Sequence, residues 1–446
     1  MSDVLGADAV EAVLAGVHAA GRGWAAREVA ERARIVGGVA EVLRSHREDL
    51  ARRVTSEMGK PVSEARAEVD KCAWLCEHHV AVAPQVLAPE PVEIGDDVEA
   101  WVAHEPLGVV LGVMPWNFPL WQLFRFAVPA VLAGNTVLVK PAPITTGSSC
   151  DVEALLVEAG LPRDVLRIVP LDEADVASRV ATLLADDRVT AVSLTGSDRA
   201  GAAVAAQAGR HLKPAVLELG GSDPFVVLDD ADLDVVVEAA VRSRFGNAGQ
   251  SCLAAKRMVV HAGVADAFTD RLVDAVAALR VGDPFDETTE IGPMARADLR
   301  DELHRQVTAS VDAGATLCLG GHPLDRPGSW YAPTVLADVV VDMPVMAEET
   351  FGPVAVVARV ADDEEAVALA RATSYGLGAS VWTRDRQRGE AVARRLRSGA
   401  VFVNRVVASD PRLPFGGVGR SGHGRELGRH GLLEFVNVRS WVVGAD

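Results

Sequence analysis

The sequence predicts an α/β fold made of two successive domains, each built on a parallel sheet. Its 446 residues are 49% hydrophobic and 24% charged, which is typical of a globular chain with two or three domains. Short apolar runs alternate with helical segments in two stretches, one before and one after residue 252. Because alternating strands and helices are typical of βαβ units, the strands of each stretch are expected to form a parallel sheet.

The first elements are a helical region and a hairpin. Residues 9–80 are rich in Ala, Arg, Glu, Val and Leu at helical spacing, and they predict two or three helices. Residues 91–106, PVEIGDDVEAWVAHEP, alternate apolar and polar side chains around a Gly-Asp-Asp turn that follows Ile94. This pattern predicts a β-hairpin.

An apolar stretch at residues 109–139 is long enough to cross a bilayer, and Arg125 is its only charge. Three prolines interrupt it, at Pro115, Pro119 and Pro129. Because prolines break helices and expose backbone groups, these interruptions argue against a membrane helix. The stretch instead predicts a buried strand, a turn and a short helix.

The two alternating stretches follow. The first contains six predicted strands, at residues 108–114, 136–140, 166–171, 190–194, 214–219 and 224–228, with helices at 145–160 and 197–209 among the intervening segments. The second stretch predicts strands at 257–263, 378–383 and 399–404. One predicted helix runs from the end of the first of these strands to about Arg280, and another covers 364–374. The apolar tail at 432–443 predicts a terminal strand that pairs within the chain or with another subunit.

Charge and cysteine content restrict the partners and the compartment. The net charge is −18 and the pI is about 5.1, so neither nucleic acid nor an anionic membrane is an expected partner. The N-terminal residues show no secretory signal, and five irregularly spaced cysteines suggest a reducing cytoplasm. Cys72 and Cys76 lie one helical turn apart, where core packing is favoured over a metal site; no metal is expected.

One cysteine lies in an unusual setting. The stretch FGNAGQSCLAAKR, residues 245–257, surrounds Cys252 with small and polar residues, whereas a structural cysteine usually has apolar neighbours. This composition favours a thiol that is presented for chemistry. The other four cysteines are interpreted as inert.

Six motifs in order resemble the aldehyde dehydrogenase superfamily. They are the cysteine stretch together with VMPWNFPLWQLFR, VLVKPAP, SLTGSDRAG, LELGGSDP and EETFGPV, and the resemblance runs from about residue 20 to the C-terminus. The variants PWNFPLWQLFRFAVP and LPFGGVGRSGHGREL are most similar to the succinate-semialdehyde dehydrogenase branch.

The resemblance implies a Rossmann-like dinucleotide-binding domain, an α/β catalytic domain and a small β hairpin used for oligomerisation. The expected boundaries are 1–88 and 107–220 for the first domain, 221–420 for the second, and 89–106 with 430–446 for the hairpin and tail strand. A homodimer or homotetramer is the expected assembly.

The resemblance also implies a catalytic set. Cys252 would form a tetrahedral adduct with an aldehyde, since a thiolate is a strong nucleophile. Asn117 would donate to the oxyanion of that adduct, together with the backbone N–H of Cys252. Glu218 would be the general base that hydrolyses the thioester, and its presence favours a free acid as product. The alternatives for the last two residues are a turn-forming asparagine and a solvated strand end.

Further residues match the cofactor site of the family. Gly196, Ser197 and Gly201 open a helix whose N-terminus would meet a pyrophosphate. The remaining cofactor residues would be Trp116, Lys140, Glu349 and Phe351.

The cofactor preference is predicted from one position at which this sequence departs from the pattern of the family. NAD-preferring members commonly carry a glutamate three residues after the lysine, where this chain has Pro143. Without that carboxylate nothing repels a 2′-phosphate, so NADP, or both NADP and NAD, are the expected cofactors.

The substrate is predicted from Arg125. In the succinate-semialdehyde dehydrogenase branch, an arginine at this spacing after the asparagine binds the distal carboxylate of the substrate. Arginine suits a carboxylate because its planar fork binds both oxygens; the alternative is a buried structural ion pair. A second arginine found in some members is replaced here by Gly246, and Arg405, Ser409 or Arg412 would supply the missing contact; Ser409 is the residue we predict. The expected reaction is the oxidation of succinate semialdehyde. The alternatives are another aliphatic or amino aldehyde, and a non-catalytic protein of the same fold.

Overall fold

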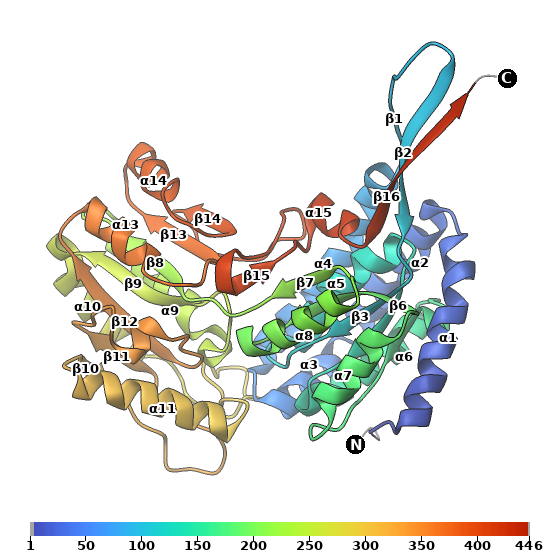
Figure 1. The fold of residues 1–446 in the computed structure, drawn as a ribbon. Coiled ribbons are helices and arrows are strands. Elements are labelled where there is room, and N and C mark those ends of the chain that lie inside the picture. Colours follow the sequence, from blue (N-terminus) through green and yellow to red (C-terminus); the bar gives the residue numbers. More distant parts are fainter. Residues whose placement is uncertain (1–3, 445–446) are drawn as a thin grey trace.

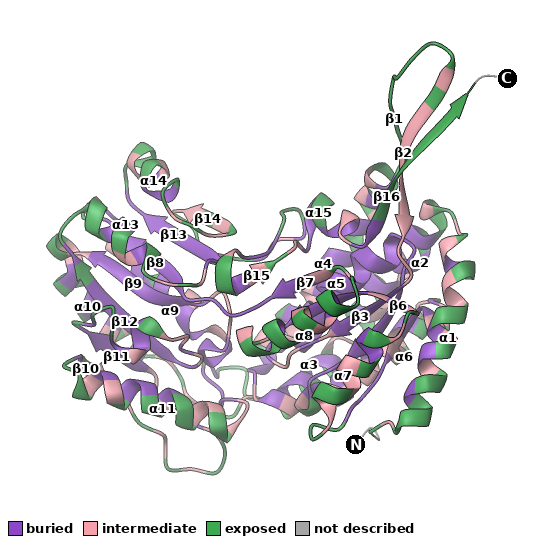
Figure 2. Cartoon of the chain, viewed as in Figure 1, coloured by how far each residue is buried: buried purple, intermediate pink, exposed green. Residues whose placement is uncertain are grey.

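The computed structural model of the chain describes residues 4–444, so the first three and last two residues of the predicted domain ranges lie outside it. Figure 1 shows two α/β bodies side by side and a narrow ribbon of strands that projects away from them. Strands of the two larger sheets are buried between helices, whereas the projecting ribbon is largely exposed (Figure 2).

The first body contains a six-stranded sheet in the order β15-β7-β6-β3-β4-β5. All of its neighbouring pairs are parallel except β15 with β7, which is antiparallel. The strands are β3 (Val109–Val113), β4 (Thr136–Lys140), β5 (Leu166–Ile168), β6 (Val189–Thr195), β7 (Ala215–Glu218) and β15 (Gly422–His423). The helices that connect them are α5 (Pro119–Leu132), α6 (Thr146–Glu158), α7 (Val176–Ala185) and α8 (Asp198–Arg210). The first five predicted strands are therefore confirmed in this sheet.

The apolar stretch at 109–139 folds as β3, α5 and β4, as its prolines predicted. Pro119 is the first residue of α5, a position where the missing N–H of proline costs no helical hydrogen bond. Every residue of α5 is buried, which explains why its sequence carries so little polar character. Within residues 4–444 no helix has both the length and the apolar character needed to span a membrane.

The second body contains a seven-stranded sheet in the order β10-β11-β12-β9-β8-β13-β14, parallel except for β10 with β11. Its strands are β8 (Asp223–Val227), β9 (Ala255–His261), β10 (Thr316–Leu319), β11 (Thr334–Ala337), β12 (Val354–Val360), β13 (Gly378–Trp382) and β14 (Ala400–Val403). Its helices are α9 (Leu233–Phe245), α10 (Ala262–Ala277), α11 (Ala297–Asp312), α12 (Pro344–Ala347), α13 (Asp363–Arg371) and α14 (Arg386–Ala393). Strands β10, β11 and β12 were not predicted.

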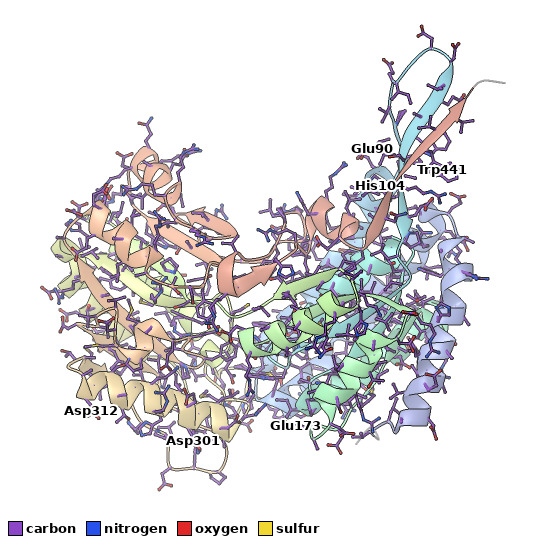
Figure 3. All side chains as sticks on the ribbon, viewed as in Figure 1. Glu90, His104, Glu173, Asp301, Asp312 and Trp441 are labelled. Atoms are coloured by element: carbon purple, nitrogen blue, oxygen red, sulfur yellow. The ribbon has the colours of Figure 1, made fainter. Side chains whose placement is uncertain are left out.

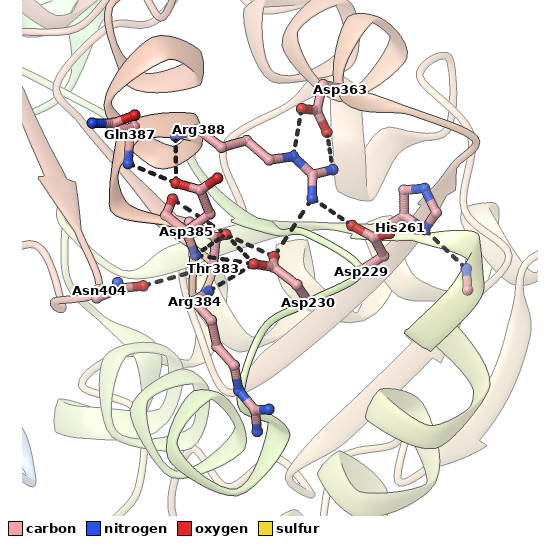
Figure 4. A network of polar contacts seen from close by, with 11 residues as sticks. Asp229, Asp230, His261, Asp363, Thr383, Arg384, Asp385, Gln387, Arg388 and Asn404 are labelled. Atoms are coloured by element: carbon pink, nitrogen blue, oxygen red, sulfur yellow. Dashed lines mark hydrogen bonds and ion pairs between the residues drawn. The ribbon is translucent and has the colours of Figure 1, made fainter.

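A polar network fastens the helices at one end of this sheet (Figure 4). Arg388 of α14 forms ion pairs with Asp229 and Asp363, each at 2.6 Å. The Thr383 hydroxyl, just after β13, donates to Asp230 at 2.6 Å. Because these residues come from four separate segments, the network holds α13 and α14 against the ends of β8 and β13.

The N-terminal region forms four helices, so the prediction of two or three was wrong. They are α1 (Ala7–Ala25), α2 (Val29–Ser45), α3 (Arg47–Met58) and α4 (Val62–Val86). Only His46 separates α2 from α3, and this break is too short to interrupt the helical spacing of the sequence. Cys72 and Cys76 of α4 are fully buried in the core, as the core-packing interpretation predicted.

The projecting ribbon is a three-stranded antiparallel sheet of β1 (Glu90–Pro91), β2 (Val98–Pro106) and β16 (Val436–Gly444). Helix α15 (Gly428–Leu433) precedes β16, so the tail strand begins four residues later than predicted. Figure 3 places Glu90, His104 and Trp441 along the ribbon, and Trp441 stacks on Trp101 with 5.6 Å between the ring centroids. The predicted hairpin is confirmed; the predicted domain boundaries remain a proposal.

Candidate active site

The segment between α9 and β9 holds Cys252 in a constrained loop. Its 3₁₀ turn (Gly246–Gly249) contains three consecutive left-handed residues, Asn247, Ala248 and Gly249, with φ of 54°, 51° and 71°. Left-handed conformations are costly for an alanine, and such strain persists only where the surroundings impose it. A Cβ at position 249 would lie 2.1 Å from the carbonyl oxygen of Gly352, so only glycine fits there.

Cys252 borders a cavity of about 330 Å³. The cavity lies between α4, α5, the cysteine loop and the segment after β14, and its lining includes Lys71, Phe118, Trp121, Arg125, Arg242, Leu253, Val406 and Ser409. The walls are therefore largely apolar with a few charged and hydroxyl groups, and the charged groups include the carboxylates of Glu64 and Glu68. The thiol is half-buried rather than sealed, so a small substrate in this cavity reaches the sulfur.

Electrostatics around Cys252 favour the neutral thiol. Burial raises the pKa of Cys252 to about 11, and the nearby Lys256 and Arg125 oppose this rise by stabilising the thiolate. The Lys256 ammonium lies 2.6 Å from Glu349 Oε1 and also donates to the carbonyl oxygen of Cys252 at 3.1 Å. The reactivity of the thiol is therefore expected to increase as the pH rises.

Asn117 is fixed against the cysteine loop. Its Nδ2 donates to the carbonyl oxygen of Gln250 at 3.0 Å, and its backbone oxygen accepts from Asn247 Nδ2 at 2.8 Å. A carboxamide has two N–H donors, and the bond to Gln250 uses one of them. The structure thus brings together two segments that lie more than 130 residues apart, next to the sulfur.

Glu218 is the last residue of β7 and lies in the same neighbourhood. Both of its carboxyl oxygens are buried without a hydrogen-bond partner among the described residues. Burial, followed by the negative charge of Glu426, raises the pKa of Glu218 well above its usual range. The chain then passes through Gly221, where a Cβ would lie 2.6 Å from the carbonyl oxygen of Cys252. Glycine at 221 therefore permits the strand that carries Glu218 to approach the cysteine loop.

Arg125 forms a buried ion pair with Glu426, and each side chain is only 2% exposed. Its guanidinium also lies 4.3 Å from the ring centroid of Phe415. The sequence prediction assigned this guanidinium to a substrate carboxylate and kept a structural ion pair as the alternative. The structure contains the ion pair, although Arg125 still lines the cavity.

Breaking this pair is expected to destabilise the fold. Glu426→Ala leaves a buried guanidinium without its counterion, so the free energy of unfolding should fall by about 3 kcal/mol. Urea unfolding followed by circular dichroism measures this loss. The control is Glu364→Gln, which removes the exposed pair between Glu364 and Arg395 and should leave the free energy of unfolding almost unchanged. Equal losses in both variants would contradict the expectation.

Ser409 lines the cavity, but Arg405 and Arg412 are not among the residues around it. Arg412 instead pairs with Asp410 at 2.6 Å. The Ser409 hydroxyl accepts from Lys71 Nζ at 2.8 Å. Lys71 and Glu426 were not predicted, because nothing in their local sequence distinguishes them from other charged residues on helices and turns.

Of the residues predicted to bind the cofactor, Lys140 ends β4, and Gly196 and Ser197 follow β6. Ser197 caps α8 by accepting from the backbone N–H of Ala200 at 3.3 Å, and Gly196 donates to the carbonyl oxygen of Glu218 at 3.0 Å. A Cβ at Gly201 would lie 2.5 Å from the Leu219 side chain, so α8 packs closely on the chain after β7. The crevice beyond the carboxyl ends of such strands is where parallel α/β sheets bind dinucleotides.

The remaining residues complete a set that fits a dinucleotide. Lys140, the last residue of β4, is buried, and this burial lowers the pKa of its ammonium. Glu349 Oε1 accepts from the backbone N–H of Gly221 at 3.0 Å. Trp116 and Phe351 meet edge to face, with 5.7 Å between ring centroids. A helix N-terminus, a cation and a carboxylate are the donor and acceptor groups that phosphate and ribose require.

Comparisons with known proteins agree with this geometry. A model of the aldehyde dehydrogenase family matches residues 3–441. The chain is 46% identical over 435 residues to the succinate semialdehyde dehydrogenase [NAD(P)+] Sad of Escherichia coli (strain K12), covering 98% of this chain and 93% of that protein. It is 47% identical to a probable succinate-semialdehyde dehydrogenase [NADP(+)] of Synechocystis sp., covering 93% and 90%.

Among solved structures, succinic semialdehyde dehydrogenase from Streptococcus pyogenes in complex with NADP+ superposes with a TM-score of 0.95 at 35% identity, covering 100% of this chain and 97% of that one. The family model spans the chain, and the segments that carry Asn117 and Glu218 both approach the loop of Cys252. The chain therefore belongs to the aldehyde dehydrogenase family.

Proposed function

We propose that the chain oxidises succinate semialdehyde to succinate with NADP or NAD as the oxidant. The observation that carries the proposal is the cavity, whose walls include Cys252 together with the cationic side chains of Lys71 and Arg125, in a chain that is acidic overall. A short aldehyde with a distal carboxylate suits a cavity whose walls carry both a thiol and cationic groups. Relatives named as succinate-semialdehyde dehydrogenases support the same substrate.

The proposed chemistry begins at the thiol. The Cys252 thiolate attacks the aldehyde carbon and forms a thiohemiacetal, whose oxyanion accepts hydrogen bonds from Asn117 Nδ2 and the Cys252 N–H. The bound nicotinamide cofactor supplies the two-electron oxidation that converts this adduct to a thioester. Glu218 then takes a proton from water, which attacks the thioester carbon. The carbon–sulfur bond breaks, the acid leaves, and the thiol is restored.

Steady-state kinetics test the proposal. Initial rates are measured with succinate semialdehyde, glutarate semialdehyde and butanal, each with NADP and with NAD. The proposal expects the highest kcat/KM for succinate semialdehyde. A higher kcat/KM for butanal would overturn the substrate assignment while leaving the aldehyde dehydrogenase activity intact.

One observation favours a second candidate, a neutral aliphatic aldehyde. Glu426 already neutralises Arg125, and Phe118, Trp121 and Val406 line the cavity with apolar surface. The butanal measurement in the same panel decides between the two substrates. Adding an amino aldehyde to the panel tests the remaining alternative substrate. A non-catalytic protein is disfavoured by the assembled thiol, amide and carboxylate.

The cofactor preference is predicted to depend on position 143. Pro143 is exposed at the start of a 3₁₀ turn (Pro143–Thr145) after β4, close in sequence to Lys140. Pro143→Glu places a carboxylate where a 2′-phosphate is expected, so the KM for NADP should rise about tenfold or more relative to that for NAD. Pro143→Gln is the neutral control. A wild-type enzyme that strongly prefers NAD would refute the prediction of NADP or dual use.

The assembly and compartment complete the proposal. The exposed apolar residues Val438, Trp441 and Val442 of β16 support a homodimer or homotetramer formed through the projecting sheet. The five irregularly spaced cysteines support a reducing cytoplasm. Light scattering coupled to size exclusion measures the subunit number.

A further inference from the structure

Lys71 is an ammonium without a carboxylate partner on the wall of the cavity. Its Nζ donates to Ser409 Oγ at 2.8 Å and lies 4.1 Å from the ring centroid of Trp121. Within the described part of the chain, no carboxylate forms an ion pair with it. Lys60 and Lys256, which are fully buried, pair with Glu68 and Glu349. Lys140 is also buried and has no ion pair among the described residues, but it lies at the predicted cofactor site.

The surroundings make this unpaired charge costly. Burial lowers the pKa of Lys71 to about 8, and the positive charge of Arg125 on α5 adds to that effect. The groups that oppose it are Cys72 and Glu68 on its own helix and Asp410 beyond Ser409. Glu68 is already engaged with Lys60, and Asp410 with Arg412. A cation in this position is stabilised by a ligand that brings its own negative charge.

The contact with Ser409 indicates how such a ligand binds. A hydroxyl that accepts from an ammonium keeps its own hydrogen free to donate elsewhere. Lys71 and Ser409 thus present an ammonium and a hydroxyl donor to the same cavity, and both groups suit a carboxylate. Gly246, which also lines this cavity, has no side chain to compete for that carboxylate.

We propose that Lys71, together with Ser409, binds the distal carboxylate of the aldehyde substrate and thereby selects ω-carboxylated aldehydes over neutral ones. The proposal rests on the proposed function, because it assumes that an aldehyde reacts at Cys252. It assigns the binding of the substrate carboxylate to Lys71. Arg125 borders the same cavity, but it is already ion-paired with Glu426.

The test measures discrimination, defined as kcat/KM for succinate semialdehyde divided by kcat/KM for butanal. Lys71→Met should reduce this ratio about 10- to 100-fold, mainly through KM for succinate semialdehyde, because a charge-assisted contact is lost. Lys71→Arg should restore most of the ratio. Lys213→Met is the matched control, since Lys213 is another half-buried lysine, bonded only to the backbone oxygen of Asp186 outside the cavity.

The pH dependence of the same ratio provides a second readout. In the wild type the ratio should fall as the pH rises through about 8, because Lys71 of the free enzyme loses its charge. In Lys71→Arg the ratio should persist to higher pH, since arginine stays protonated. Ionisation of Cys252 affects both aldehydes alike and cancels in the ratio. Burial raises the pKa of Glu64 on the same cavity wall to about 7, and its ionisation is common to the wild type and Lys71→Arg, so the difference between the two profiles reports on Lys71.

Each outcome decides one question. If the wild type prefers succinate semialdehyde and Lys71→Met keeps the ratio within about twofold, the Lys71 proposal is overturned and the proposed function stands. If the wild type does not prefer the acid aldehyde, both are overturned. Should Lys71→Met fail to fold, Ser409→Ala replaces it, with an expected loss of about 3- to 10-fold in the ratio; an unchanged ratio in that variant overturns the proposal.

Discussion

Replacing Cys252 with alanine abolishes the oxidation of aldehydes, with an expected fall in kcat of about 10⁴-fold or more. Without the thiolate no covalent adduct forms, and the oxyanion contacts of Asn117 have no tetrahedral intermediate to stabilise. The fold should survive, because Cys252 is half-buried at the edge of a core cluster and borders the cavity. Reduction of the cofactor, followed by absorbance, measures the loss.

Cys318→Ser is the matched control for this variant. Cys318 is also half-buried, lies on β10 and contacts the backbone oxygen of Thr316, far along the chain from the cavity-lining residues. It should retain full activity. Iodoacetamide should label Cys252, and the labelling rate should increase with pH towards about 11 as the thiol ionises. If Cys252→Ala retained more than about 1% of the wild-type activity, Cys252 would not be the nucleophile.

Glu218→Gln is expected to separate oxidation from hydrolysis. The thiol and the oxyanion donors are intact in this variant, so one equivalent of reduced cofactor per site should appear rapidly. The steady-state rate that follows should be about 10²- to 10⁴-fold lower than in the wild type, because no base activates the water that attacks the thioester. Rapid-mixing absorbance measures the burst, and intact mass spectrometry detects the acyl group on Cys252.

The pH dependence of hydrolysis follows from the environment of Glu218. Because burial and Glu426 raise its pKa, Glu218 is protonated at low pH and gains its basic form as the pH increases. The hydrolytic rate of the wild type should therefore rise with pH, and Glu218→Gln should lose this dependence. Glu434→Gln is the control, since Glu434 also places a negative charge near Glu218, but its carboxylate already accepts from the backbone N–H of Arg425. A burst in that control, or none in Glu218→Gln, would contradict the assignment.

Local sequence patterns predicted much of the fold. The runs that became β3, β4, β6 and β7 are short, apolar and bounded by turn residues, and a buried parallel strand needs no more than that local signal. The run Val354–Val360 carries the same signal and became β12, yet was not predicted. The four-residue strands β10 and β11 are weak locally and depend on pairing with their neighbours. The number of N-terminal helices was wrong because single-residue breaks leave helical spacing intact.

By itself the sequence determined the chemistry, because the reactive residue types stand in short ordered motifs: Cys252 among small residues, Asn117 between prolines, and Glu218 before two glycines. Only the tertiary structure decided how the charges pair. Arg125 meets Glu426 from 301 residues away, and Lys71 meets Ser409 from 338 residues away. The ionisation and partners of a buried charge depend on which distant segments fold around it, and no local spacing encodes that.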